Sequence, residues 1–319
     1  MAKEAKDIVD EINGITGGKV ATWGDDDQFE GGWQSTGILP LDYAIGKGFP
    51  KGRITEIRGL PSTGKSSLCL NLIKRAQADG VQCVYIDAEY TFDSEFAESM
   101  GVKVSDLAIV RPDCGEQAFE VMYKVLRERS AGVIIVDSTS SLVPRGDIES
   151  EAGKNMIGSQ ARLISMELRK IVPVLSASEA VIVFISQYRM NIMGSQYDPY
   201  TTPGGMALRF YTSVSIEIKR TGYVKKSEDI IGYQAKLVVK KNKVGRPHGS
   251  CEVTFLNEGG FSAEADVIEL GEKSGVIVRD GNSYLYGDLK LGASLAKARD
   301  HLKENPALAS EIISKITAQ

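Results

Sequence analysis

Residues 59–66 read GLPSTGKS and match the pattern G-x-x-x-x-G-K-[ST] of a phosphate-binding loop. The segment follows a short apolar run that begins at Ile54, and it opens a stretch from Lys65 to Ala78 with the apolar spacing of a helix. In this context the N–H groups of the loop and of the helix N-terminus form an anion site. Lys65 is expected to reach the β- and γ-phosphates of a nucleotide, and the Ser66 hydroxyl to bind Mg²⁺.

Short apolar runs alternate with helical segments through the middle of the chain. The runs are ITEIRGL, VQCVYIDAE, LAIVRP, VIIVDST and VIVFISQ, and the segment Glu116 to Arg129 is one of the helices between them. Strands that are apolar throughout indicate a parallel sheet covered by helices on both faces. After Tyr211 the runs SVSIEIKR, YQAKLVVKKNK and SCEVTFLN alternate between apolar and polar residues, which predicts antiparallel additions at the sheet edge. The fold class is therefore α/β.

The two ends of the chain differ from this core. Ala2 to Ile15 has the pattern of a short amphipathic helix, and the Gly-rich, acidic residues 24–32 are typical of a linker. From Ser262 the pattern predicts a helix, a hairpin around Asp280-Gly281-Asn282 and two further helices. We expect an N-terminal appendage over 1–33, a core over 34–261 and a small α+β domain over 262–319.

Composition excludes several classes of protein. The chain has 319 residues, of which 42% are apolar and 25% are charged, as in ordinary globular proteins. Its longest uncharged apolar run, Ala180 to Ser186, is far shorter than the roughly 20 residues that span a membrane, so no membrane association and a cytoplasmic location are expected. Four dispersed cysteines and two histidines leave little for a zinc site or a Ser-His mechanism.

Two carboxylates end neighbouring predicted strands. Asp137 ends VIIVD and is the candidate to hold Mg²⁺ through water. Glu89 ends YIDAE, at the sheet edge where open α/β sheets bind their ligands, and it is the candidate to orient the attacking water. The alternative is that Glu89 only caps a helix.

Seven motifs occur in an order that resembles the bacterial RecA recombinase family: LPSTGKSS, YIDAEYTFD, RPDCGEQAFE, VIIVDS, VFISQYRMNI, TTPGGMALRFY and VVKKNKV. The resemblance runs from about Gly17 to the C-terminus. It implies a RecA-like P-loop core and a DNA-stimulated ATPase that forms an open helical filament on single-stranded DNA. Such a filament pairs the strand with homologous double-stranded DNA and exchanges strands.

The resemblance also implies roles for individual residues. Glu89 would activate water, Gln187 would sense the γ-phosphate, and Lys241 and Lys243 would reach the nucleotide of a neighbouring subunit, as arginine fingers do. ATP would be held by Gly59, Leu60, Pro61, Ser62, Thr63, Gly64, Lys65, Ser66 and Ser67, with adenine contacts at Asp93, Phe96 and Asn257. The family has tyrosine at the last two positions. Without the resemblance, the run KKNK reads as a solvated edge strand.

Two segments are expected to face DNA. Residues 140–250 hold 16 Lys and Arg against 9 Asp and Glu, although the whole chain has a net charge of −4. The first segment is Gly146 to Gly158, with Ile157 as an apolar wedge and Arg162 and Arg169 two turns apart on the following helix. The second is the long apparent loop Tyr188 to Gly205, in which the family's strand-holding positions match Arg189, Ile192, Gly204 and Gly205.

Departures from the family pattern at Ile157 and Asn257 suggest a divergent member, with a phage origin as a hypothesis. Three other readings remain open: a ring-forming replicative helicase, a small-molecule kinase and a DNA scaffold that does not hydrolyse ATP. The sequence leaves open which mediator or repressor proteins such a filament would meet.

Overall fold

The computed structural model describes residues 5–17, 20–22, 31–150, 158–190, 200–201, 205–226, 228–257 and 259–317. The chain divides into two compact units, Met1–Gly32 and Trp33–Gln319. In the first unit, helix α1 (Ala5–Thr16) exposes the apolar side chains of Ile8, Ile12 and Ile15. The Asn13 carboxamide closes the turn after α1, because its Oδ1 accepts from the Val20 and Ala21 N–H groups, both at 2.7 Å.

Nine strands form one sheet within the described part of the second unit, in the order β13-β12-β11-β10-β3-β7-β6-β4-β5. The strands from β10 to β5 pair in parallel, and β11, β12 and β13 add antiparallel to one edge. Their bounds are β3 (Arg53–Gly59), β4 (Cys83–Asp87), β5 (Leu107–Val110), β6 (Val133–Asp137), β7 (Val181–Gln187), β10 (Thr212–Lys226), β11 (Asp229–Asn242), β12 (Ser250–Leu256) and β13 (Gly260–Phe261).

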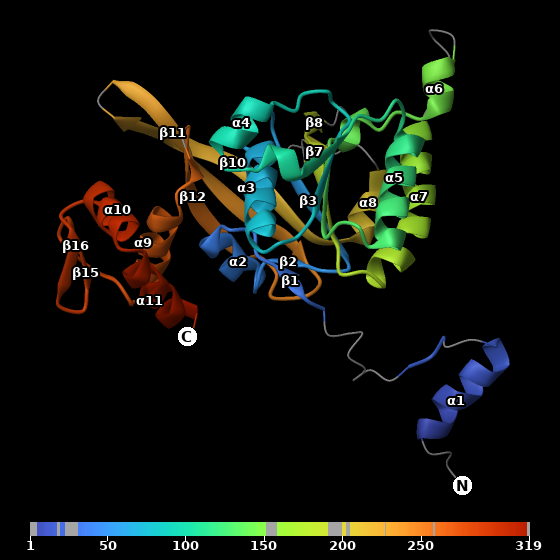
Figure 1. The fold of residues 1–319 in the computed structure, drawn as a ribbon, viewed down its shortest axis with the longest axis horizontal. Helices are drawn as coiled ribbons and strands as arrows, with labels where there is room; N and C mark the ends of the chain where they lie inside the picture. The colour runs from blue at the N-terminus through green and yellow to red at the C-terminus, as the bar shows by residue number, and fades with distance from the viewer. Residues whose placement is uncertain are drawn as a thin grey trace. The chain divides into compact units, whose positions relative to one another are not determined.

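Helices cover both faces of the sheet (Figure 1). On β6, Ile135 belongs to the apolar core that contains Leu72 of α3, and its neighbour Ile134 belongs to the core that contains Phe119 of α5. Successive strand residues thus enter different cores, which is why β6 is apolar throughout. The helices of this unit before its C-terminal part are α2 (Leu39–Ile45), α3 (Lys65–Ala78), α4 (Ser94–Ser99), α5 (Gly115–Glu128), α6 (Arg145–Glu149), α7 (Ser159–Ser176) and α8 (Gly205–Tyr211).

The structure confirms the α/β class and corrects one detail of the predicted sheet. Of the three alternating strands, β11 and β12 pair only antiparallel, but β10 pairs in parallel with β3 and antiparallel with β11. β10 is therefore the junction between the two kinds of pairing. The chain reaches it through α8, a crossover connection that returns the chain to the same end of the sheet as β3.

The C-terminal part contains α9 (Ala263–Lys273), the antiparallel strands β14 (Val278–Asp280), β15 (Ser283–Tyr286) and β16 (Leu289–Gly292), and the helices α10 (Leu295–Glu304) and α11 (Pro306–Thr317). It has an apolar core of its own, which includes Ile268 and Leu302. Asp280 pairs with Ser283 across the predicted hairpin turn, and Gly281 there has φ +57°, which favours glycine. None of the described helices is long and apolar enough to cross a membrane.

The described residues also form two small two-stranded sheets. β1 (Trp33–Gln34) pairs antiparallel with β2 (Phe49–Pro50). β8 (Arg189–Met190) pairs antiparallel with β9 (Tyr200–Thr201). The segment Tyr188 to Gly205 was expected to be a loop, but β8 and β9 within it pair with each other. Residues 191–199 between these two strands lie outside the described residues.

Candidate nucleotide-binding site

The loop between β3 and α3 has the conformation that its glycines predict. Gly64 has φ +96°, and a Cβ there would lie 2.2 Å from the Tyr233 hydroxyl, so only glycine fits. The Lys65 ammonium folds over the loop and donates to the carbonyls of Leu60 at 2.8 Å and Gly59 at 3.3 Å. Burial lowers the pKa of Lys65, although the Asp137 and Glu89 carboxylates act in the opposite direction.

A cavity of about 360 Å³ lies beside this loop. It brings together the ends of three parallel strands, because its lining includes residues 61–67, Glu89 after β4, Asp137 of β6 and Gln187 of β7. Carboxyl ends of parallel strands share one sheet edge, where α/β proteins bind ligands. The structure therefore assembles the predicted phosphate loop and the three predicted polar residues in one place.

Asp137 is held by two hydroxyl donors. Its Oδ2 accepts from Ser66 Oγ at 2.8 Å and from the buried Tyr85 hydroxyl at 2.6 Å. Burial raises the pKa of Asp137, and these two hydrogen bonds oppose that rise. The adjacent Ser66 and Asp137 oxygens are hard ligands of the kind that Mg²⁺ prefers. The described residues contain no cluster of three or more metal-ligating side chains, so phosphate and water oxygens would have to complete the coordination.

Glu89 is fixed by two donors, one directly after β6 and one at the end of β7. Ser138 Oγ donates to Glu89 Oε1, and Gln187 Nε2 donates to the same oxygen at 2.9 Å. The sequence predicted Glu89 and Gln187 as site residues separately, and the structure places them in direct contact. Two hydrogen bonds to one oxygen hold the Glu89 carboxylate in one orientation at the cavity.

The residues expected at adenine are only partly brought together. Phe96 lines the cavity. Asp93 caps α4 by accepting from the Phe96 N–H at 3.0 Å, and the Asn257 amide donates to the Ile230 carbonyl at 3.2 Å. Neither Asp93 nor Asn257 is among the described residues that line the cavity.

Three lining residues were missed by the sequence analysis. The rings of Tyr233 and Phe255 stack with centroids 4.7 Å apart, and the Arg220 guanidinium lies 4.2 Å from the Tyr233 ring centroid. Arg220 also donates to the Ser62 carbonyl at 2.6 Å. Tyr233 pairs with Phe255 across β11 and β12. The alternating apolar residues of the two strands are visible in the sequence, but the register that places these two rings opposite each other is not.

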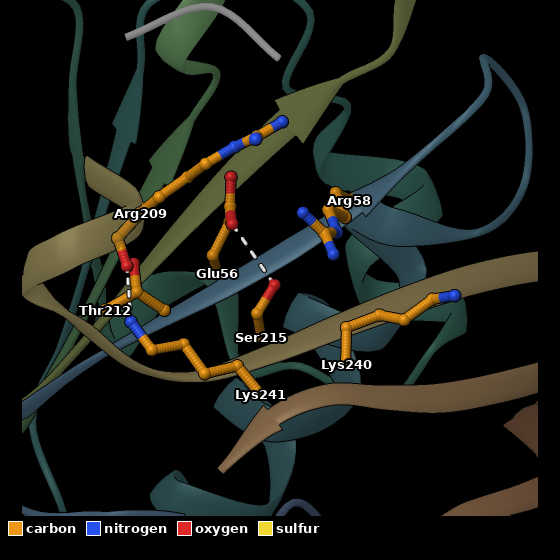
Figure 2. Close-up of a pocket in the computed structure, with 7 residues that line it drawn as sticks. All are labelled: Glu56, Arg58, Arg209, Thr212, Ser215, Lys240 and Lys241. Carbon is orange, nitrogen blue, oxygen red and sulfur yellow. Dashed lines mark hydrogen bonds between the residues drawn. The ribbon is translucent and has the colours of Figure 1, made fainter. Parts of the chain in front are cut away.

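Lys241 and Lys243 are not among the described residues that line the cavity beside the phosphate loop. Lys241 lines a second cavity of about 360 Å³ with Glu56, Arg58, Arg209, Thr212, Ser215 and Lys240 (Figure 2). The Lys241 ammonium donates to the Arg209 carbonyl, and the Lys243 ammonium donates to the Phe210 carbonyl at 2.8 Å. Neither lysine is among the described residues around the phosphate loop of its own chain.

The residues expected to face DNA are described in part. Arg162 and Arg169 are exposed on α7, and Gly205 begins α8 with φ +64°. Arg189 lies in β8, where its backbone pairs with Thr201. Ile157, Ile192 and Gly204 lie outside the described residues.

Comparison with known proteins identifies the family. The model of the RecA N-terminal domain matches residues 3–262, and the model of the RecA C-terminal domain matches residues 265–319. The chain belongs to the RecA family. It is 44% identical over 283 residues to Protein RecA of Laribacter hongkongensis and 42% identical over 283 residues to Protein RecA of Pseudomonas putida. Each match covers 88% of this chain and 80% of the relative.

This membership agrees with the site geometry. RecA-family proteins are DNA-dependent ATPases that act as recombinases, and the phosphate loop of this chain lines one cavity with Asp137 and Glu89. The chain is therefore a recombinase that binds ATP and DNA.

Proposed function

We propose that the cavity beside the phosphate loop holds ATP with Mg²⁺ and that Glu89 orients the water that attacks the γ-phosphate. The observation that carries this proposal is the position of Glu89, which lines the same cavity as Lys65 and is held by Ser138 and Gln187. Ser66 and Asp137 would hold Mg²⁺, which neutralises charge on the phosphates. The Lys65 ammonium donates to the Leu60 and Gly59 carbonyls of the loop, and a phosphate oxygen would become its acceptor when nucleotide binds.

The aromatic pair Tyr233 and Phe255 supports a place for the base in addition to Phe96. Their stacked rings line the same cavity, and flat apolar faces suit an adenine ring. Asp93 and Asn257 remain proposals for polar contacts to adenine.

We assign Lys241 and Lys243 to the nucleotide of a neighbouring subunit. Both ammonium groups dock on carbonyls at the end of α8, away from the described cavity of their own chain. A charge placed in this way can act on a γ-phosphate only across an interface, as arginine fingers do. The hydrolytic site would then be complete only in the filament.

DNA is proposed to meet the exposed Arg162 and Arg169 of α7 and the segment from Tyr188 to Gly205, with Arg189, Ile192, Gly204 and Gly205 as contacts and Ile157 as a wedge. Gln187 would link the two ligands, because it ends β7 at the nucleotide and precedes this segment. We further propose a cytoplasmic location, mediator or repressor proteins as partners, and the domain limits 1–33, 34–261 and 262–319.

One experiment tests this function directly. ATP hydrolysis is measured with and without single-stranded DNA, and electron microscopy of the same sample shows the assembly. Stimulation by DNA together with open helices is the expected result. Closed rings would favour the helicase reading, and hydrolysis indifferent to DNA would favour a small-molecule kinase.

A further inference from the structure

Tyr188 connects the start of the phosphate loop to β10 through two hydrogen bonds. Its N–H donates to the Gly59 carbonyl at 3.2 Å, and its hydroxyl donates to Glu217 Oε1 on β10 at 2.8 Å. Tyr188 directly follows Gln187, which holds Glu89. Any shift of the end of β7 when nucleotide binds therefore reaches Glu217 through a single side chain.

Glu217 is a nearly buried charge, with 9% of its side chain exposed. Its Oε2 lies 3.1 Å from the ammonium groups of both Lys219 and Lys240. Burial alone would raise the pKa of Glu217, but the Tyr188 hydroxyl and the two lysines hold it below its ordinary value. A buried carboxylate with these partners is costly to move, because a shift leaves charges unpaired.

A β-bulge joins this ion pair to the lysines proposed to act across the interface. Ser215 of β10 pairs with Lys241 and Ile216 pairs with Val239, so Lys240 is the extra residue on β11. The bulge lets Lys240 and Lys241 line one cavity, whereas successive residues of a regular strand face opposite sides. In Figure 2 the two side chains run in opposite directions from the strand, and the Lys241 ammonium lies toward Thr212 and the Arg209 carbonyl.

We propose that Tyr188, Glu217 and Lys240 form a positioning relay that couples the nucleotide site of one subunit to the lysines that complete the site of the next. The relay runs from Gly59 through Tyr188 and Glu217 to the bulge, where Lys240 directly precedes Lys241. It rests on the proposed function, because it requires Lys241 and Lys243 to act in trans. These three residues touch no nucleotide themselves, and they set where the bulge holds Lys241.

The chain offers a matched pair of variants for the test. Lys240→Gln and Lys219→Gln each remove one ammonium group from the same Glu217 oxygen at the same distance, but only Lys240 belongs to the bulge. Lys240→Gln is expected to lower kcat for hydrolysis on single-stranded DNA by about tenfold, within the usual range for coupling between sites, with KM for ATP unchanged. Lys240→Arg should restore kcat, and Tyr188→Phe should lower it as Lys240→Gln does. Lys219→Gln should keep the parental kcat.

Mixed filaments test the direction of the relay. Lys65→Ala subunits carry intact lysines but a defective phosphate loop, so they should restore hydrolysis at the loops of Lys240→Gln subunits in a mixture. Equal losses of kcat in Lys240→Gln and Lys219→Gln, or no recovery on mixing, would overturn the relay. The double variant Lys241→Ala/Lys243→Ala is mixed in parallel. If it recovers and Lys240→Gln does not, the relay alone is wrong, and if neither recovers, the shared site of the proposed function is wrong as well.

Discussion

Replacing Glu89 by glutamine is expected to slow hydrolysis while nucleotide binding is kept. Both donors to this side chain, Ser138 Oγ and Gln187 Nε2, are directed at Oε1. The carbonyl oxygen of a glutamine can accept both hydrogen bonds in the same rotamer. The amide nitrogen then replaces Oε2, so the change removes a basic oxygen and leaves the side chain the same size and shape.

The expected loss follows from the role of the missing base. A positioned general base contributes about 10²- to 10⁴-fold, which is about 2.7–5.4 kcal/mol of activation free energy. ATP affinity should stay near the parental value, because the Lys65, Ser66 and Asp137 contacts remain. Complexes with DNA should therefore persist longer in the Glu89→Gln variant.

The assay is single-turnover ATP hydrolysis on saturating single-stranded DNA, with nucleotide affinity measured separately. Ser138→Ala is the matched control, since it removes one donor to Glu89 but keeps the carboxylate. A hydrogen bond to a charged group is worth about 1.5 kcal/mol or more, so a loss of about tenfold is expected with Gln187 still holding the carboxylate. A Glu89→Gln variant that turns over at the parental rate would show that another group orients the water, and that Glu89 is held by Ser138 and Gln187 for structural reasons only.

Three further predictions address the phosphate loop, the interface and the C-terminal part. Lys65→Ala should weaken ATP binding about tenfold or more, since a hydrogen bond from a charged group is lost; unchanged affinity in equilibrium binding would contradict this. Lys241→Ala/Lys243→Ala should abolish DNA-stimulated hydrolysis but leave the ATP affinity of dilute monomers unchanged, and an equal loss of affinity would place the lysines in their own site. Burial raises the pKa of Asp266 well above its ordinary value, so the folded state favours the neutral acid and the free energy of unfolding falls as pH rises from about 4 through the folded-state pKa. Asp266→Asn cannot ionise, so urea unfolding at pH 5 and pH 8 should show the variant gaining stability relative to the parent at the higher pH, and a difference that is the same at both pH values would refute this.

Much of the site was predictable because its signals are local. The glycines and Lys65 of the phosphate loop lie within one short stretch of the chain. Asp137 ends β6 and Glu89 follows the end of β4, so the pattern alone could place both carboxylates at one sheet edge. The helix predicted over Lys65 to Ala78 is α3 with the same bounds. A loop that must wrap a phosphate restricts both its residue types and what flanks it.

The remaining features depend on which strands are neighbours and on their register. Tyr233 reaches the phosphate loop because β11 and β12 extend the sheet beyond β10, and its pairing with Phe255 is a cross-strand relation that neither strand encodes alone. Lys240 joins Lys241 on one cavity because of a bulge that the alternating pattern of β11 does not reveal.

The α/β class, the phosphate loop and the chemistry of the side chains beside it can be predicted from the sequence, because each of these is a short-range pattern of residue types. The direct contact of Gln187 with Glu89, the presence of Tyr233 in that site, and the docking of Lys241 and Lys243 on carbonyls of α8 emerge from the tertiary structure alone. The physical reason is that contacts between distant strands are selected by the packing of the whole sheet, in which a shift of one residue would turn every side chain to the other face.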